Sequence, residues 1–232
     1  MKTFCIINLK GGVGKTTTSV NLSAGIAELG YRTLLCDFDP QCDATGWLSE
    51  KDIGRETYEF LTGTRRLKST VQNIGAKLDL LPGSPFLGSL VEISLASRLS
   101  GAPYDFCFMD TGPGLSALNQ IVLGSADDLI LPMLPDMLSV SGLSRMLTLI
   151  KRFSRLELAG VLLGSMDKTT NLSRDIEEQL RDRLSVFKTT IPRSVKFREC
   201  PQYHKNILQY APGSPGALAF QNLSKEVGDS HA

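Results

Sequence analysis

A glycine-rich stretch near the amino terminus has the composition of a phosphate-binding loop. Residues 8–18 read Asn-Leu-Lys-Gly-Gly-Val-Gly-Lys-Thr-Thr-Thr, between an apolar run at 3–7 and a run with apolar residues at helical spacing. Such glycines leave backbone N–H groups free to turn onto phosphate oxygens, and the amino end of the next helix adds a partial positive charge. The candidate nucleotide-binding residues are Lys10, Gly11, Gly12, Val13, Gly14, Lys15, Thr16 and Thr17.

Two of these side chains have roles that follow from their chemistry. Lys15 would reach the β- and γ-phosphates of a nucleotide, and the Thr16 hydroxyl would take one coordination position on Mg²⁺. The general pattern G-x-x-x-x-G-K-[ST] would place a glycine at position 9, where this chain has Leu9 followed by Lys10. The structural alternative is a glycine-rich turn with two solvated lysines.

Acidic residues end two further apolar runs. Residues 34–41 read Leu-Leu-Cys-Asp-Phe-Asp-Pro-Gln, and the segment 104–114 has four apolar residues directly before Asp110. Because ligands of α/β sheets bind outside the carboxyl ends of the strands, we expect Asp37, Asp39 and Asp110 near the phosphates. A carboxylate can position or activate water, and Asp110 has the Walker B arrangement, which binds Mg²⁺ through a water. Capping of the following turn is the alternative for Asp39.

Apolar runs alternate with helical segments along the whole chain. Expected strands cover 3–8, 33–38, 78–81, 106–110, 128–132, 160–164 and 188–191, and expected helices cover 15–29, 86–99, 117–123, 141–153, 171–185 and 216–227. This alternation predicts an α/β fold, with a mostly parallel twisted sheet and helices on both faces. We expect a single domain over residues 1–232, with 228–232 fraying.

The composition narrows the function classes. The net charge of +1 means that any binding to nucleic acid needs a local basic patch. No run approaches the roughly 18 apolar residues of a membrane span, and the amino terminus does not read as a signal peptide. The five cysteines are scattered without a C-x-x-C pair, so we expect a reduced, cytosolic protein that uses cysteine as a small core residue.

The spelling of these motifs resembles the ParA/MinD/Soj family of deviant Walker A ATPases. The loop K-G-G-x-G-K-T-T, the run D-x-D-P-Q and the Walker B segment carry the resemblance, and the stretches 167–173, 187–196 and 211–217 resemble its ParA (Soj-like) branch. The resemblance covers roughly residues 3–227 and implies a P-loop NTPase that hydrolyses ATP with Mg²⁺. In relatives, the loops corresponding to Asp167 and Pro192 face the adenine.

The resemblance also assigns roles to single residues. It implies that Lys10 reaches across an ATP-dependent homodimer to the partner's nucleotide, and that Asp39 positions the attacking water. The candidate catalytic residues are therefore Lys10, Lys15 and Asp39, and the candidate metal-binding residues are Thr16 and Asp110. Thr111 stands where many P-loop ATPases have a glutamate base, which shifts the catalytic task to Asp39.

The chain departs from the family pattern at the Walker B loop and at residues 134–136, among other places. Members of the family usually have the sequence D-T-P-P or D-C-P-P at the end of the Walker B strand, whereas here Gly112 takes the place of the first proline. We therefore expect a more flexible loop. Residues 134–136 read Leu-Pro-Asp, where relatives often carry a polar residue, a proline or glutamate, and an aromatic residue. Since this loop shapes the dimer face in relatives, the partner surface is expected to differ.

Basic residues are concentrated in the segment 181–205, which has seven Lys or Arg against two acidic residues. The resemblance implies that an ATP-bound dimer binds DNA without sequence preference through such a patch. It also implies that a ParB-like or other activating partner stimulates hydrolysis, in plasmid or chromosome partition. A solvated face with scattered ion pairs is the alternative. The candidate DNA-binding residues are Arg181, Arg183, Arg193, Lys196 and Arg198.

Three other functions remain open from the sequence. The same DNA-bound cycle could position a protein cargo, and a metabolic ATP-dependent ligase of this superfamily would need a substrate pocket. A MinD-like membrane-cycling ATPase would need a carboxyl-terminal amphipathic helix with a basic rim. Because the helix expected at 216–227 has a single lysine, Lys225, we expect it to pack in the core. No membrane partner is expected, and the expected location is the cytoplasm, on the nucleoid.

Overall fold

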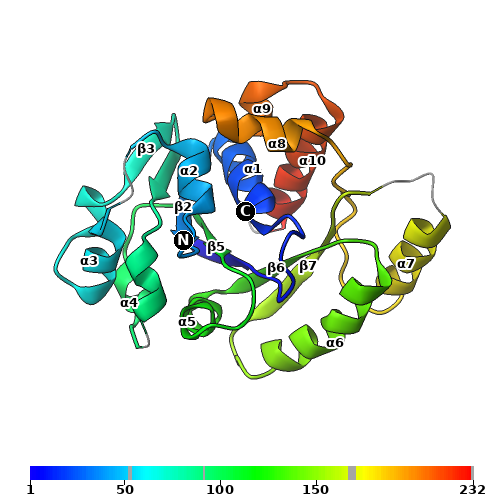
Figure 1. The fold of residues 1–232 in the computed structure, drawn as a ribbon, viewed down its shortest axis with the longest axis horizontal. Coiled ribbons are helices and arrows are strands. Elements are labelled where there is room, and N and C mark those ends of the chain that lie inside the picture. Colours follow the sequence, from blue (N-terminus) through cyan, green and yellow to red (C-terminus); the bar gives the residue numbers. More distant parts are fainter. Residues whose placement is uncertain (52–53, 91, 167–170, 231–232) are drawn as a thin grey trace.

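A seven-stranded sheet forms the centre of the described structure (Figure 1). The computed structural model describes residues 1–51, 54–90, 92–166 and 171–230. The strand order is β3-β4-β2-β5-β1-β6-β7, and each pairing is parallel except β3 with β4 at one edge. The strands are β1 (Lys2–Ile6), β2 (Thr33–Phe38), β3 (Gln72–Gly75), β4 (Leu78–Leu81), β5 (Phe106–Thr111), β6 (Asp128–Met133) and β7 (Glu157–Leu163). The predicted α/β fold with a mostly parallel sheet is confirmed.

Helices cover both faces of the sheet (Figure 1). Side chains alternate along a strand, so Phe4 and Ile6 join the core beneath α1 and α10, while Cys5 joins the opposite core with α5 and α6. The helices are α1 (Lys15–Glu28), α2 (Asp43–Leu48), α3 (Glu56–Thr62), α4 (Leu95–Leu99), α5 (Ala117–Ser125), α6 (Met137–Ile150), α7 (Asn171–Arg181), α8 (Lys196–Glu199), α9 (Ile207–Tyr210) and α10 (Pro215–Asp229).

The last helix, α10, is part of the core, as expected from its composition. Phe220, Leu223 and Val227 are buried in the core that α10 shares with α1. The helix extends beyond the expected end at Val227 to Asp229, and Gly228 is buried. Of the tail 228–232 that we expected to fray, residues 231–232 lie outside the described residues. No described helix is long and apolar enough to cross a membrane.

Two of the expected elements are wrong. The segment 188–191 forms no strand, because the backbone N–H groups of Lys188 and Thr189 donate to the Glu226 carboxylate on α10, at 2.6 and 3.1 Å, instead of to a neighbouring strand. The helix expected at 86–99 is replaced by a 3₁₀ turn, Pro85–Ser89, and the short α4. Glycine and serine at positions 88 and 89 have low helix propensity, which favours this break.

The five cysteines are all free and buried, at 2% exposure or less. Cys36 and Cys107, on the neighbouring strands β2 and β5, have sulfur atoms 3.7 Å apart. The expectation that these residues serve as small core side chains is confirmed for the folded chain.

Candidate functional site

Three neighbouring strands deliver the sequence motifs to one edge of the sheet. In the strand order, β5 lies between β1 and β2, and its residue Asp110 is in register with Ile6 of β1 and Asp37 of β2. Because the strands are parallel, their carboxyl ends meet at the same edge. The glycine loop after β1, the acidic turn after β2 and the end of β5 therefore converge, as the sequence predicted.

The glycine loop presents open backbone to this edge. Gly12 and Gly14 have φ values of 71° and 92°, in the left-handed region, and Gly14 is the N-cap of α1. A Cβ atom added at Gly11, Gly12 or Gly14 would meet nothing within 4 Å. The loop is thus an uncovered concave surface at a helix N-terminus, which is the form of an anion-binding site.

Lys15 lies directly under this loop. Its side chain is buried, and Nζ donates to the carbonyl oxygen of Lys10 at 3.5 Å. Burial lowers the pKa of Lys15, while the nearby carboxylates of Asp110 and Asp39 act in the opposite direction. Among the described residues this long hydrogen bond is the one that the Lys15 ammonium makes, and a buried cation so placed can gain much from a phosphate on the loop.

Asp110 has an unsatisfied oxygen in the same place. Ser19 donates to Oδ1 at 2.8 Å, whereas the buried Oδ2 has no hydrogen-bond partner among the described residues. Burial, and then repulsion from Asp37, raises the pKa of Asp110 to about 8, although the polar side chains of Ser19 and Thr16 offset part of this effect. A carboxylate oxygen without a partner, next to a threonine hydroxyl, fits a hard cation such as Mg²⁺. Thr16 and Asp110 are the residues expected to bind a metal from the sequence, and this role stays a prediction.

The two acids at the end of β2 have different environments. Asp37 is fully buried and accepts hydrogen bonds from the backbone and hydroxyl of Thr45, at 2.8 and 2.6 Å, so it braces the turn. Burial raises the pKa of Asp37 to about 6. Asp39 instead lines a cavity together with Lys15 and Thr16, and its Oδ1 accepts the Gln41 N–H at 2.9 Å. Asp39 therefore has a suitable place to act on a bound phosphate, and Asp37 has a structural role.

Lys10 lies at the outer side of the loop and forms an ion pair. Its Nζ contacts both carboxylate oxygens of Asp136, at 3.2 and 3.0 Å, and the Ser139 hydroxyl at 3.3 Å. Asp136 also caps α6 by accepting the Ser139 N–H at 2.7 Å. Partial burial raises the pKa of Asp136, but the hydrogen bonds from Ser139 and Lys10 and the charge of Lys10 lower it by more. The pKa of Asp136 therefore lies below its usual value. The pair is more than a third exposed, so Lys10 can leave it at little cost.

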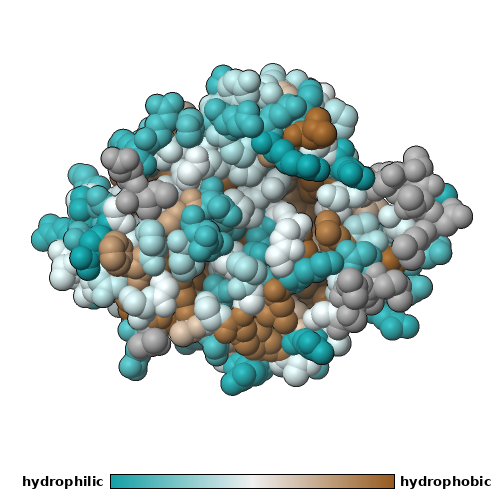
Figure 2. Space-filling view, in the orientation of Figure 1, coloured by the Kyte–Doolittle hydropathy of each residue, from teal (hydrophilic) through white to brown (hydrophobic). Residues whose placement is uncertain are grey.

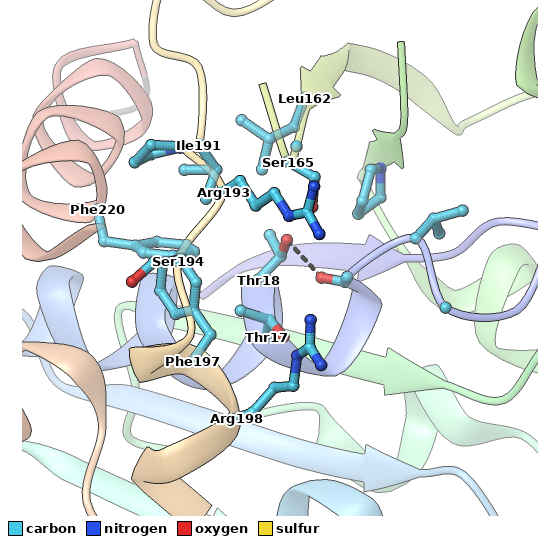
Figure 3. A pocket seen from close by; sticks show the side chains of 16 residues that line it. Thr17, Thr18, Leu162, Ser165, Ile191, Arg193, Ser194, Phe197, Arg198 and Phe220 are labelled. Carbon is cyan, nitrogen blue, oxygen red and sulfur yellow. Dashed lines mark hydrogen bonds between the residues drawn. The ribbon is translucent and has the colours of Figure 1, made fainter. Parts of the chain in front are cut away.

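Two cavities flank the glycine loop. One, of about 410 Å³, is lined by Lys15, Thr16, Asp39 and Asp43 among others. The other, of about 270 Å³, lies between the loop and the segment 191–198. Figure 3 shows Arg193 and Arg198 extending in this second cavity toward Thr17 and Thr18. Phe197 and Phe220, with ring centroids 5.8 Å apart, form an apolar wall beside them.

The five basic residues expected to bind DNA lie in two groups. The chain at 186–192 runs beside β7, with bridges from Val161 to Val186 and from Met166 to Pro192. Arg181 and Arg183 lie before this segment, and Arg181 is engaged with Glu177 and with carbonyl oxygens. The second group, Arg193, Lys196 and Arg198, follows this segment, and Arg193 and Arg198 line the cavity beside the glycine loop.

Several residues of the site were missed in the sequence. Ser19 lies one helical turn after Lys15, so its position facing Asp110 could have been found from the i, i+4 spacing. Asp43 and Gln41 follow the acidic turn directly and line the phosphate side. No short-range signal identifies Asp136 as the partner of Lys10, because the two are 126 positions apart. The loop at 167–170, which was expected to face adenine, lies outside the described residues.

Comparison with known proteins identifies the family. A family model described as an AAA domain matches residues 1–159. The chain is 37% identical to the chromosome-partitioning ATPase Soj of Thermus thermophilus, over 98% of this chain and 95% of that protein. It is 34% identical to the sporulation initiation inhibitor protein Soj of Bacillus subtilis, over 97% of this chain and 98% of that protein.

Solved structures show the same fold. Cobyrinic acid a,c-diamide synthase from Mycobacterium smegmatis, with a bound ATP analogue and magnesium, superposes with a TM-score of 0.84 at 26% identity, over 97% of this chain and 93% of that one. A putative plasmid partition protein from Borrelia burgdorferi bound to AMPPNP has a TM-score of 0.86 at 22% identity, over 99% of each chain. The motifs lie at one edge of the sheet, and the relatives match nearly the whole length of the chain. This chain therefore belongs to the ParA/MinD/Soj family of P-loop ATPases.

Proposed function

We propose that this chain binds and hydrolyses ATP with Mg²⁺, forms a homodimer when ATP is bound, and binds DNA without sequence preference in that state. Stimulation of hydrolysis by a ParB-like or other activating partner would release it, in the service of plasmid or chromosome partition on the nucleoid. The observation that carries the proposal is the open glycine loop, with the buried Lys15 beneath it and the unpartnered Asp110 oxygen beside it.

The two cavities give the nucleotide an orientation. The cavity that contains Lys15, Thr16 and Asp39 would take the β- and γ-phosphates, and the cavity with the apolar Phe197 wall would take the nucleoside. Thr16 and Asp110 would hold Mg²⁺, which neutralises charge on the phosphates when it is bound. Asp39 would orient water for attack on the γ-phosphate, and Lys15 would stabilise the charge that develops on its oxygens.

Dimerisation would use Lys10 and the face around it. In the single chain the Lys10 ammonium is paired with Asp136, and this exposed pair is easily exchanged for a phosphate of the partner's nucleotide. Figure 2 shows apolar surface gathered below the middle of the molecule, between the positions of α5 and α6 in Figure 1. Apolar surface of this kind is suited to contact with a second copy.

Nucleotide binding and hydrolysis can be tested separately. Lys15→Ala should abolish binding of a fluorescent ATP analogue, with exposed Lys68→Ala as the matched control that binds normally. Asp39→Ala should bind ATP and DNA yet hydrolyse ATP slowly. Retained ATP affinity in Lys15→Ala would refute the assignment of the phosphate-binding loop. Normal turnover in Asp39→Ala would refute the role of Asp39 in orienting the attacking water.

DNA binding can be tested with random-sequence duplex DNA in a salt series, with ATP-Mg²⁺, with ADP and without nucleotide. We expect binding with ATP-Mg²⁺ alone, falling steeply as salt rises, because a dimer doubles the number of phosphate contacts. Replacing Arg183 or Lys196 by alanine should each lower the salt slope by about one. Absence of binding in each nucleotide state would reject this part of the proposal and would call for a liposome assay of the membrane-cycling alternative.

A further inference from the structure

The loop that follows β5 leaves little space for a side chain beside Asp39. Gly112 follows the strand directly, and a Cβ atom placed on it would lie 3.0 Å from Oδ1 of Asp39 and 3.2 Å from its Cγ. A side chain at position 112 would therefore crowd the Asp39 carboxylate, which would have to shift by a few tenths of an ångström. This is the position at which the chain departs from the proline of its family's usual spelling.

The loop is fixed in this place by Asn119 on α5. Asn119 is 2% exposed, and its Nδ2 donates to the carbonyl oxygens of Gly112 and Gly114, both at 3.0 Å. Both amide protons are thus used on a single loop. On the other side, the Thr111 hydroxyl donates to the Ile6 carbonyl at 2.9 Å. Position 112 is consequently flanked by hydrogen bonds on both sides, and the more flexible loop expected from the sequence stays a prediction.

Asp39 is also held from its own turn. Its backbone N–H donates to Oδ1 of Asp37 at 3.1 Å, and its carboxylate accepts the Gln41 N–H at 2.9 Å. The side chain is 6% exposed. These hydrogen bonds hold Asp39 on the side of its own turn, and Gly112 lies on the other side of the carboxylate. A movement of the Gly112 backbone would therefore change the position of the carboxylate.

We propose that Gly112 and Asn119 are positioning residues for hydrolysis: Asn119 fixes the loop so that the backbone of Gly112 sets the place of the Asp39 carboxylate. The inference rests on the proposed role of Asp39. A displacement of about 1 Å at a reacting group costs roughly 100-fold in rate. A methyl group at position 112 must move the carboxylate by a few tenths of an ångström, so a loss of roughly three- to tenfold is expected.

The test compares Gly112→Ala and Asn119→Ala with matched controls. Gly46→Ala adds a methyl group on α2 where nothing lies within 4 Å, and Asn206→Ala removes a buried capping asparagine from α9. The rate of hydrolysis is measured in single turnover, and the Kd of ATP-Mg²⁺ by competition with a fluorescent analogue. We expect the two loop variants to hydrolyse roughly three- to tenfold more slowly with Kd within about twofold of native, and the controls to hydrolyse at the native rate.

The double variant gives a readout that a general loss of structure does not produce. If both residues act through the position of one loop, Gly112→Ala with Asn119→Ala should lose no more rate than the more severe single change. Losses that multiply, a Kd that rises as much as the rate falls, or a native rate in Gly112→Ala would each overturn the inference. Should Asn119→Ala not fold, Gly112→Ala and its Gly46 control decide alone.

The outcome is separate from that of the proposed function. A native rate in Asp39→Ala would mean that the role of Asp39 itself fails, whatever Gly112→Ala does. A slow Asp39→Ala together with a native Gly112→Ala would refute the positioning inference alone.

Discussion

Replacing Asp110 by asparagine should change how the stability of the protein depends on pH. Burial and repulsion from Asp37 raise the pKa of Asp110 to about 8 in the folded chain, whereas in an unfolded chain an aspartate has a pKa of about 3.9. Between these two values the folded state keeps a proton that the unfolded state has lost. The free energy of unfolding therefore falls as pH rises through this window, and the decrease ends above the folded pKa.

The size of the effect follows from the same shift. Each pH unit inside the window removes roughly 1 kcal/mol of stability through this carboxyl group. Asparagine has the same shape, can keep the hydrogen bond from Ser19 and does not ionise. The free energy of unfolding of Asp110→Asn, relative to native, should therefore rise by roughly 1 kcal/mol per pH unit from pH 5 to 8 and then level off. Asp37, whose pKa is raised to about 6, titrates in both proteins and largely cancels in the difference.

The measurement is urea unfolding of both proteins with EDTA at pH 5, 6, 7, 8 and 9, with exposed Asp182→Asn as the control. Curves that stay parallel from pH 5 to 8 would refute the reasoning about the buried charge. In a second series, ATP-Mg²⁺ should stabilise the native protein strongly by mass action and Asp110→Asn much less. Equal stabilisation of the two proteins would contradict the metal-binding role of Asp110.

Two further changes probe contacts outside the phosphate cavity. Asp136→Asn keeps a good N-cap for α6 but removes the charge that is paired with Lys10. ATP-dependent dimerisation, measured by analytical ultracentrifugation, should therefore become stronger. An unchanged dimerisation constant would mean that the ion pair has no influence. Gly25→Ala would place a methyl group against Ser224, where α1 and α10 meet, and should lower the free energy of unfolding by about 1–3 kcal/mol. Adding Ser224→Ala to Gly25→Ala should recover part of that loss. If Gly25→Ala lowers the free energy of unfolding equally with serine and with alanine at position 224, the clash with Ser224 is not its cause.

The sequence allowed the central strands and the phosphate loop to be predicted because their signals are local. Apolar runs mark β1, β2 and β5, and the glycines with Lys15 mark the turn between strand and helix. The convergence of Asp39 and Asp110 on this loop followed from the rule that parallel strands share a carboxyl edge. Each of these predictions needed only a few neighbouring residues.

What could not be predicted depends on contacts between distant segments. The strand expected at 188–191 has suitable residue types, but the N–H groups of Lys188 and Thr189 bond to Glu226, which lies 38 and 37 positions further along the chain. The hydrogen bonds from Asn119 to the carbonyl oxygens of Gly112 and Gly114 were missed because no pattern in the sequence links these positions. Local propensity gives no information about such partners.

The burial of all five cysteines has a practical consequence for work on this protein. The thiolate is the reactive form, and burial raises the pKa of Cys42 to about 12 and that of Cys200 to about 11. The folded chain should therefore react slowly with maleimides, and the rate of labelling reports how often the core opens. A Lys68→Cys variant would instead carry an exposed thiol that reacts first with a fluorophore. Each chain would then carry one label at a known position, and the fluorescence could follow the association of two copies in real time.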